Sequence, residues 1–388
     1  MKKILKRIPM KLWALLCVLV ALTFFTNDFG LVDIQKTALV LAAGIDRTED
    51  GFALTAQIAV PKGTDRTTGG TSSVEIEGSG ATVPDCLADL YAKTGWVPKL
   101  IYCDLVLLGE STVTDDVFNC LDYFLHNEYV PDSCLLAACE GSAGEMLSST
   151  SAIDDTSALA LEKLFSDAAQ KSGQVMTTTL REFAIGYFGA SKSGYMPYVR
   201  AQAQEGGGQE QGGAQNSAGA QRSGQQQKIY SAQETAVFSE GRMAALLSPE
   251  ETFAFSLLEG NVYAGTFAAD GKTYIILKNS GSVNVETAPA PAIGLEIACK
   301  VQLYGENEAS PPDTLAKGTI SAQEEERLSQ LLTGYARSLW QTCAQAECDL
   351  LFFRRSLQRS SMEVYGKWKD IPLISVSADI SARVRSLK

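Results

Sequence analysis

The chain contains one histidine, His126, among 388 residues, and this limits the chemistry that its side chains can perform. A Ser-His-Asp or Cys-His triad needs a histidine as its base, so any such triad would have to use His126. Metal sites with two or more histidine ligands are excluded. His126 follows Phe124 and Leu125 at the end of an expected helix, where its charge complements the helix dipole. The sequence therefore disfavours the common nucleophilic enzymes.

The nine cysteines do not have the spacing of a metal site or of a disulfide framework. Cys134 and Cys139 are five positions apart on an expected strand, so their side chains point to opposite faces. Cys343 and Cys348 lie near the end of an expected helix, about 140° apart around its axis, and do not clip a metal. We expect the cysteines on apolar faces to act as small core residues: Cys86, Cys103, Cys120 and Cys299.

The charged and glycine-rich motifs also lack a catalytic or ligand-binding pattern. Asp115–Asp116 and Asp154–Asp155 precede expected helices, where carboxylates cap the N-terminus. Gly206–Gly208 has no strand before it and no helix after it, so it is not a phosphate loop. The basic pair Arg354–Arg355 is too small for a nucleic-acid surface, and the pI is near 4.8. We predict no catalytic, metal-binding or cofactor-binding residue, no cofactor and no nucleic-acid partner.

The N-terminus has the pattern of an export signal. Lys2, Lys3, Lys6, Arg7 and Lys11 precede an apolar run, Leu12–Phe25. Since positive charge stays in the cytoplasm, we expect the acidic remainder of the chain to lie outside it. Residues 1–27 are therefore interpreted as an N-terminal signal or anchor segment of a protein with net charge −12.

Three fates of this segment remain open. The apolar run has 14 residues, fewer than the roughly 20 that span a bilayer comfortably, and no convincing small-x-small cleavage site follows it. We favour an uncleaved anchor over a cleaved signal. Lipidation at Cys17 is the third alternative, but the bulky Leu16 before it fits a lipobox poorly.

A composition shift divides the rest of the chain. From Ala201 to Gln227, Gly and Gln fill 16 of 27 positions without apolar periodicity, which is typical of a flexible linker. This predicts an N-terminal α+β module over 28–200, a Gly/Gln-rich linker over 201–227, and a C-terminal α+β module over 228–388 with a long helix near 321–346.

Both modules mix strands with helices. Four polar pairs spaced as capping boxes indicate helix starts: Ser142 with Glu145, Thr179 with Glu182, Ser248 with Glu251, and Ser321 with Glu324. Apolar runs and alternation predict strands over 37–44, 52–60, 99–109, 134–139, 235–238, 261–267, 273–277, 293–304 and 374–384, with a turn over 45–51. The expected fold class is α+β: multi-domain mixed sheets with packed helices, behind an N-terminal hydrophobic segment.

Several segments, in order along the chain, resemble the Ger(x)C family, the C subunit of spore germinant receptors. Val32–Asp46 is similar to the family's first strand and its Gly-Ile-Asp turn. The other matching segments are Leu105–Glu110, Val117–Asn127, Leu135–Leu147, Thr235–Glu251, Leu257–Gly260, Cys348–Leu351 and Tyr365–Trp368. The family usually carries a lipidated Cys followed by Trp where this chain has Asp28–Leu31, so the hydrophobic segment would replace the lipid anchor.

The resemblance implies a non-enzymatic, membrane-tethered accessory subunit of a nutrient-germinant receptor. It would act in spore germination through protein–protein contacts with a membrane-spanning A-type and a permease-like B-type subunit. Most of the chain would lie outside the cytoplasm, at the spore inner membrane. The alternative from another class is a generic exported solute- or envelope-binding module unrelated to spores. A cell-surface hydrolase that uses carboxylates alone is a further alternative.

The anchor interpretation can be checked on the mature protein. We expect the hydrophobic N-terminus to remain in it and metabolically supplied palmitate not to label the chain, because Leu16 does not suit a lipobox. Intact-mass analysis and radiolabelling measure both. A label that disappears on Cys17→Ala would contradict the prediction.

Overall fold

The computed structural model describes residues 13, 15–18, 37–60, 72–149, 151, 154, 156–203, 228–306 and 320–387. Of the N-terminal segment, residues 15–18 are helical. Among the described residues, no helix has both the length and the apolar character needed to cross a membrane. The predicted linker lies outside the described residues, except for 201–203, which end a strand.

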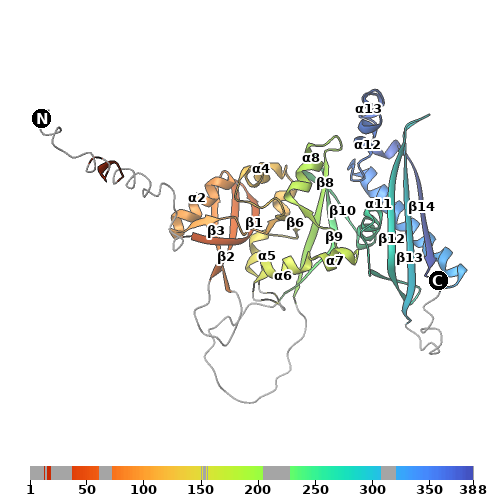
Figure 1. The fold of residues 1–388 in the computed structure, drawn as a ribbon, viewed down its shortest axis with the longest axis horizontal. Helices are drawn as coiled ribbons and strands as arrows, with labels where there is room; N and C mark the ends of the chain where they lie inside the picture. Colours follow the sequence, from red (N-terminus) through yellow and green to blue (C-terminus); the bar gives the residue numbers. More distant parts are fainter. Residues whose placement is uncertain are drawn as a thin grey trace, which may run out of the picture. The chain divides into compact units, whose positions relative to one another are not determined.

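A mixed sheet is built from the first part of the chain (Figure 1). Its strands run in the order β10-β9-β8-β6-β5-β1-β2-β3, with β4 paired to β1 and β7 to β6. The bounds are β1 Thr37–Thr48, β2 Gly51–Val60, β3 Ser72–Gly80, β4 Val97–Lys99, β5 Leu105–Leu108, β6 Leu135–Cys139, β7 Thr178–Thr179, β8 Ser193–Ala203, β9 Lys228–Ser239 and β10 Arg242–Leu247. Strands β1, β5, β6 and β8 are parallel neighbours, and the outer pairs are antiparallel.

Helices cover both faces of this sheet, which explains its apolar central strands. All four residues of β5 are buried, as expected for a parallel strand covered on both sides. Val106 and Leu108 belong to the core with α2 (Val83–Thr94), α4 (Phe118–His126) and α8 (Leu180–Phe188). Leu105 and Leu107 belong to the core of the other face. That face packs α5 (Ala143–Ser148) and α6 (Ser157–Leu164), while α3 (Glu110–Val113) and α7 (Asp167–Lys171) are short connections.

The second sheet has four strands in the order β11-β12-β13-β14. Their bounds are β11 Thr266–Ala269, β12 Lys272–Glu286, β13 Ala292–Glu306 and β14 Ser377–Ser386. Alternate residues of β13, from Ile293 to Leu303, are buried against helices, and those between them are more exposed. The helices of this part are α9 Pro249–Glu259, α11 Ala322–Gln345, α12 Phe353–Ser360 and α13 Met362–Trp368, followed by a 3₁₀ turn, Leu373–Ser375. The two sheets with packed helices confirm the predicted α+β class.

Three of the four predicted helix starts have a complete capping box. Thr179, Ser248 and Ser321 each accept a hydrogen bond from the backbone N–H three residues on, and the glutamate there returns one. At the fourth, Ser142 accepts from the N–H of Glu145, but the glutamate does not complete the box. The N-terminus of α5 instead faces a carboxylate from β1, which is described below.

Several predictions were wrong in their extent. The strand expected over 374–384 begins only at Ser377, because Leu373–Ser375 form a 3₁₀ turn. The strands expected over 235–238 and 273–277 are longer, at 228–239 and 272–286. The strand expected over 99–109 is broken by a turn at Ile101–Tyr102, so only β5 continues it. The turn expected over 45–51 is shorter, because β1 continues to Thr48 and pairs there with Gly51 of β2. The strand expected over 261–267 starts only at Thr266.

The backbone N–H groups of Val262 and Tyr263, before β11, donate to groups other than the β12 backbone, and pairing with β12 begins only at Ala264 and Gly265, which bond to Ile276. The N–H of Val262 donates to the Asn279 side chain at 3.0 Å, and that of Tyr263 donates to the Lys171 carbonyl at 2.8 Å. Ala264 has a φ of 59°, which interrupts an extended backbone. Apolar alternation in the sequence does not reveal these partners, and it therefore extended the strand too far.

Residues 228–247, which the sequence analysis assigned to the C-terminal module, form β9 and β10 of the first sheet. The proposed domain boundaries stay a prediction.

A buried carboxylate, Asp349, lies where the segment after α11 meets this sheet. Its backbone N–H donates to the Ser193 hydroxyl at 2.9 Å, and its carboxylate accepts from the N–H groups of Phe353 and Arg354 at 2.7 and 2.8 Å. Burial raises the pKa of Asp349 to about 6, although these two N–H groups favour the charged form.

The raised pKa makes stability depend on pH. The unfolded carboxyl ionises near pH 4 and the folded one near pH 6, so the folded state loses stability as the pH rises between these values. Because each pKa unit corresponds to about 1.4 kcal/mol, the full shift is worth about 3 kcal/mol, and we expect Asp349 to contribute a fall of about 2 kcal/mol in the free energy of unfolding between pH 4 and pH 6. Urea titrations at pH 4 and pH 6 measure it.

Asp349→Asn should lack this part of the pH dependence, since the amide does not titrate. Asp379→Asn, at an exposed position of β14, is the matched control and should keep it. Equal pH dependence of wild type and Asp349→Asn would contradict the prediction.

Candidate functional site

The carboxyl ends of the parallel strands β1, β5 and β6 meet at one edge of the first sheet, where α/β proteins usually bind ligands. Asp46 lies near the end of β1, Gly109–Glu110 follows β5, and Glu140–Ser142 follows β6. The structure thus brings together three of the segments on which the family resemblance rests.

The Asp46 carboxylate lies at the centre of this edge. One of its oxygens accepts from the Ser142 hydroxyl at 2.8 Å and from the Gly144 N–H at 2.9 Å, and the other accepts from the Ala143 N–H at 2.9 Å. The carboxylate therefore caps α5. Gly109 lies against it so closely that a Cβ there would come within 1.9 Å of the Asp46 oxygen, which only glycine avoids.

The neighbouring polar groups also hydrogen-bond to one another. The Glu110 carboxylate accepts from the Gly141 N–H at 3.2 Å, and the Glu110 N–H donates to the Gly141 carbonyl at 2.8 Å. The Thr112 hydroxyl donates to the Ile45 carbonyl at 2.9 Å. The donors and acceptors named here are used to join three loops, so this edge is a structural junction.

The residues singled out in the sequence have structural surroundings. His126 is the last residue of α4, and its 79% exposed side chain lies 3.2 Å from the Asp122 carboxylate. Asp116 accepts from the Phe118 N–H at the start of α4, as predicted, whereas Asp154 pairs with Lys163 at 2.6 Å. Within the described ranges, no three His, Cys, Asp or Glu side chains converge as a metal site requires.

The cysteines are free, and all except Cys17 are buried. This confirms the expectation that they act mainly as core residues. Burial raises the pKa of Cys120 and of Cys348 to about 12, which keeps both thiols protonated and poorly nucleophilic. Cys17, the candidate for lipidation, is exposed in the helical residues 15–18. Its modification stays a prediction.

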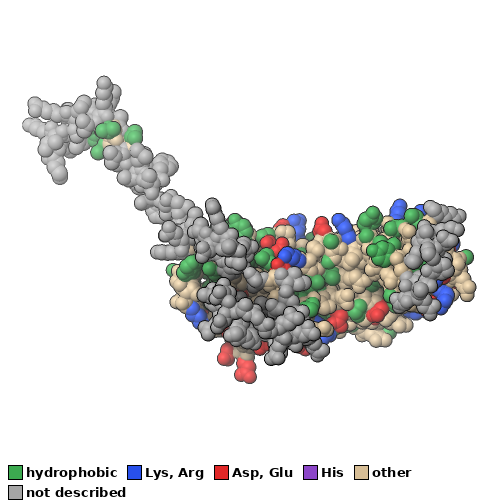
Figure 2. Space-filling view, turned by 90° about the horizontal axis from the view of Figure 1, so that it is seen from below, with side chains coloured by type: hydrophobic (Ala, Val, Ile, Leu, Met, Phe, Trp, Pro, Cys, Tyr) green, Lys and Arg blue, Asp and Glu red, His purple; other side chains and the backbone are tan. Residues whose placement is uncertain are grey.

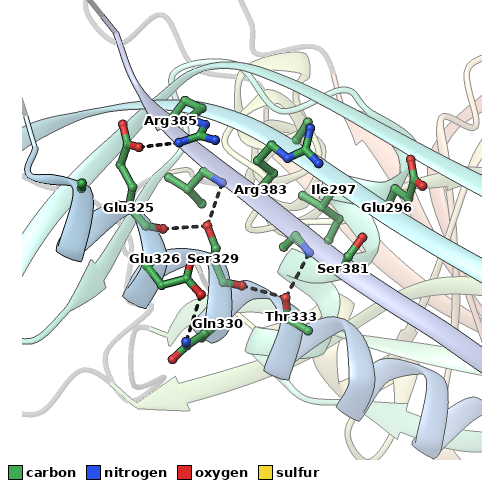
Figure 3. Close-up of a pocket in the computed structure, with 14 residues that line it drawn as sticks. Glu296, Ile297, Glu325, Glu326, Ser329, Gln330, Thr333, Ser381, Arg383 and Arg385 are labelled. Atoms are coloured by element: carbon green, nitrogen blue, oxygen red, sulfur yellow. Dashed lines mark hydrogen bonds and ion pairs between the residues drawn. The ribbon is translucent and has the colours of Figure 1, made fainter.

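A polar groove of about 380 Å³ lies along α11 and the strands β13 and β14 (Figure 3). Small-molecule pockets are mostly apolar, whereas charges of both signs line this one. The charged and hydroxyl residues that line it are Glu296, Glu325, Glu326, Ser329, Thr333, Ser381, Arg383 and Arg385. The Arg385 guanidinium pairs with Glu325 at 3.0 Å.

The wall of the groove is made by an unusual pairing between a helix and an edge strand. The N–H groups of Ala382, Val384 and Ser386 on β14 donate to side-chain oxygens of α11 at 3.0, 2.9 and 2.7 Å. The acceptors, in the same order, are Thr333, Ser329 and Glu325. Four helical residues rise about 6 Å and two strand residues about 6.6 Å, so the spacings match. Side chains of α11 thereby take the place of a further strand and cover this part of the sheet edge.

Sequence reasoning missed the roles of Asp46 and of the α11 acceptors. Asp46 carried a signal, since a polar residue at the end of an apolar strand is placed at the ligand edge of a parallel sheet. Glu325, Ser329 and Thr333 are spaced by four, which puts them on one helix face. That pattern shows a polar stripe but does not show which strand it faces.

Basic side chains do not gather into a stripe among the described residues of the face drawn in Figure 2, where Lys and Arg are scattered among Asp and Glu. Nucleic-acid surfaces concentrate Lys and Arg on one face.

The Asp46 junction predicts a large effect of a small truncation. Asp46→Ala leaves three donors of α5 without their carboxylate, and we expect a loss of about 3 kcal/mol in the free energy of unfolding. Urea unfolding followed by circular dichroism measures it. The control Asp379→Ala, at an exposed position, should change stability by less than about 0.5 kcal/mol. Similar stabilities of the two variants would show that the junction does not hold α5.

Comparison with known proteins identifies both parts of the chain. Residues 31–201 match the family model described as spore germination protein N-terminal domain. Residues 233–387 match the model described as spore germination B3/GerAC like, C-terminal. A search of curated proteins gave no match. The solved crystal structure of the GerBC protein is similar at 15% sequence identity with a TM-score of 0.46, over 88% of this chain and 96% of that one. Because the two family models together match most of the chain, in N-terminal to C-terminal order, the chain belongs to the GerAC-like spore germination family, as the Ger(x)C resemblance indicated.

Proposed function

We propose that the chain is a non-enzymatic, membrane-tethered accessory subunit of a nutrient-germinant receptor, acting through contacts with an A-type and a permease-like B-type subunit. The observation that carries the proposal is the pair of family matches, over 31–201 and 233–387. Both family descriptions name spore germination proteins. They support a role in germination and leave the partners as part of the proposal.

The internal use of its polar groups supports a role without catalysis. At the carboxyl edge of the first sheet, Asp46 and Glu110 accept hydrogen bonds from neighbouring loops. Asp349 caps α12, and Glu251 accepts from the hydroxyls of Ser338 and Thr342 on α11 at 2.6 Å each. A catalytic acid or base needs a side chain that can exchange a proton with a substrate. These carboxylates instead join elements of the fold.

The tether is proposed from the N-terminal sequence. Five basic residues precede the apolar run Leu12–Phe25, which favours insertion with the basic end in the cytoplasm. The body would then lie outside the cytoplasm, beside membrane-spanning partners. An inserted segment holds a protein on the membrane more firmly than a single acyl chain does.

The polar groove of α11 and β14 is the surface that we assign to a partner. Arg383 is exposed and lines the groove together with Glu296 and Glu326. Charged groups at the rim of an interface contribute to binding specificity and raise the association rate. The hydrogen bonds from β14 to α11 leave side chains, rather than the strand edge, for a partner to contact along 382–386.

Co-purification tests this function. The tagged full-length chain is isolated from membranes of the spore-forming host, and the permease-like subunit is quantified in the eluate. We expect Arg383→Glu to lower its recovery about tenfold, since reversing one interface charge costs on the order of 1.4 kcal/mol or more. Arg359→Glu, at an exposed position of α12, is the matched control and should leave recovery unchanged.

Two results separate the parts of the proposal. If wild type recovers the permease-like subunit and Arg383→Glu does so equally well, the assignment of the groove is wrong and the receptor role stands. If wild type does not recover that subunit, and deletion of the protein leaves nutrient germination unchanged, the receptor role is wrong.

A further inference from the structure

Large exposed apolar side chains occur on two loops of the first part of the chain. The segment between α2 and β5, which includes the short strand β4 and is called the first loop below, carries Trp96, Ile101 and Tyr102, which are 48%, 52% and 55% exposed. The loop between α4 and β6 carries Tyr129, which is 50% exposed. Single exposed residues of this kind are ordinary, but a group of four large ones at one edge indicates an interaction surface.

The topology of the sheet places both loops at the same edge. The first loop leads into β5 and the second into β6, and these strands are parallel to each other and to β1. Their amino ends therefore lie together, opposite the edge of Asp46. The Asp104 N–H donates to the Leu41 carbonyl at 3.1 Å, and the Lys99 ammonium lies 5.0 Å from the Tyr129 ring. These contacts connect the first loop to β1 and to the second loop.

The chemistry of these side chains suits the boundary between lipid and water. Trp and Tyr have an apolar body and a polar tip, and both are enriched at membrane interfaces. Lys99 can extend its ammonium toward headgroups while its stem covers apolar surface. The second loop also carries acidic residues, Glu128 and Asp132, and Asp132 pairs with Arg181 at 2.9 Å. The rings, rather than a net positive charge, would therefore provide the attraction.

The point where the chain enters the body argues for lipid as the occupant. Strand β1 begins at Thr37, at this same edge, only twelve residues after Phe25 ends the apolar run. Twelve residues span at most about 40 Å when fully extended. If Leu12–Phe25 is inserted in a membrane, the covalent link keeps the amino edge of the sheet within that distance of the bilayer.

We propose that this amino edge is a membrane-contacting surface, on which Trp96, Ile101, Tyr102 and Tyr129 enter the headgroup region of the bilayer. The inference rests on the proposed tether and adds an orientation to it. The aromatic edge faces the lipid, and the Asp46 edge faces away from it. The body would thus be held by two attachments, one covalent and one interfacial.

Fluorescence quenching in vesicles tests the orientation. The full-length chain with Cys17→Ser and Ile101→Cys is labelled with bimane and reconstituted in vesicles of phosphatidylglycerol and phosphatidylethanolamine that carry a doxyl group high on the acyl chain. The matched control is Tyr304→Cys, at a 65% exposed position of β13. We expect quenching at position 101 to be at least about threefold stronger than at position 304, because interfacial side chains lie at the depth of the quencher.

Further variants keep the test decisive. A label on Tyr102→Cys repeats the measurement at a second exposed position, and Trp96→Ser with Tyr129→Ser should weaken the quenching at position 101. Vesicle flotation of the same samples reports the tether separately. Flotation with equally weak quenching at 101, 102 and 304 would overturn the orientation and leave the tether intact. Failure to float would overturn both.

Discussion

The Asp46 carboxylate is the interaction on which the first part of the fold depends. It accepts three hydrogen bonds from the start of α5 and lies against Gly109, so that it joins the segments after β1, β5 and β6. A partly buried carboxylate is costly to leave without donors, and backbone N–H groups at a helix start need an acceptor. The N–H groups at the start of α5 supply the donors that the carboxylate needs, and the carboxylate supplies the acceptor that these N–H groups need. The edge that many α/β proteins use for ligands is here used for architecture.

The same principle continues through the second part of the chain. Asp349 caps α12, Glu251 connects α9 with α11, and the oxygens of α11 accept from the N–H groups of β14. Since these polar groups hydrogen-bond to other elements of the fold, we look for functional surfaces among the exposed faces and grooves of the molecule. Two of them differ in character: a charged groove along α11 and an aromatic edge at the amino ends of β1, β5 and β6. We propose a protein partner for the first and a lipid surface for the second.

Local sequence patterns predicted the elements whose stability is itself local. The capping boxes at Thr179, Ser248 and Ser321 start helices, because both partners of each box lie within three residues. The apolar alternation of β13 likewise indicates a half-buried strand. Prediction failed where the deciding partner is distant in sequence. Val262 donates to the Asn279 side chain rather than to a strand backbone, and the Asp46 carboxylate accepts from the N–H groups of Ala143 and Gly144 at the start of α5.

Local sequence patterns were enough to predict the α+β class, the starts of α8, α9 and α11, and, through ordered motifs, the family. The folded chain was needed to show that Asp46, Glu110 and Ser142 meet, that β9 and β10 complete the first sheet, and that α11 covers the edge of β14. Propensity and periodicity act over a few residues, whereas these contacts join segments tens of residues apart or more. Their partners are selected by the packing of the whole sheet.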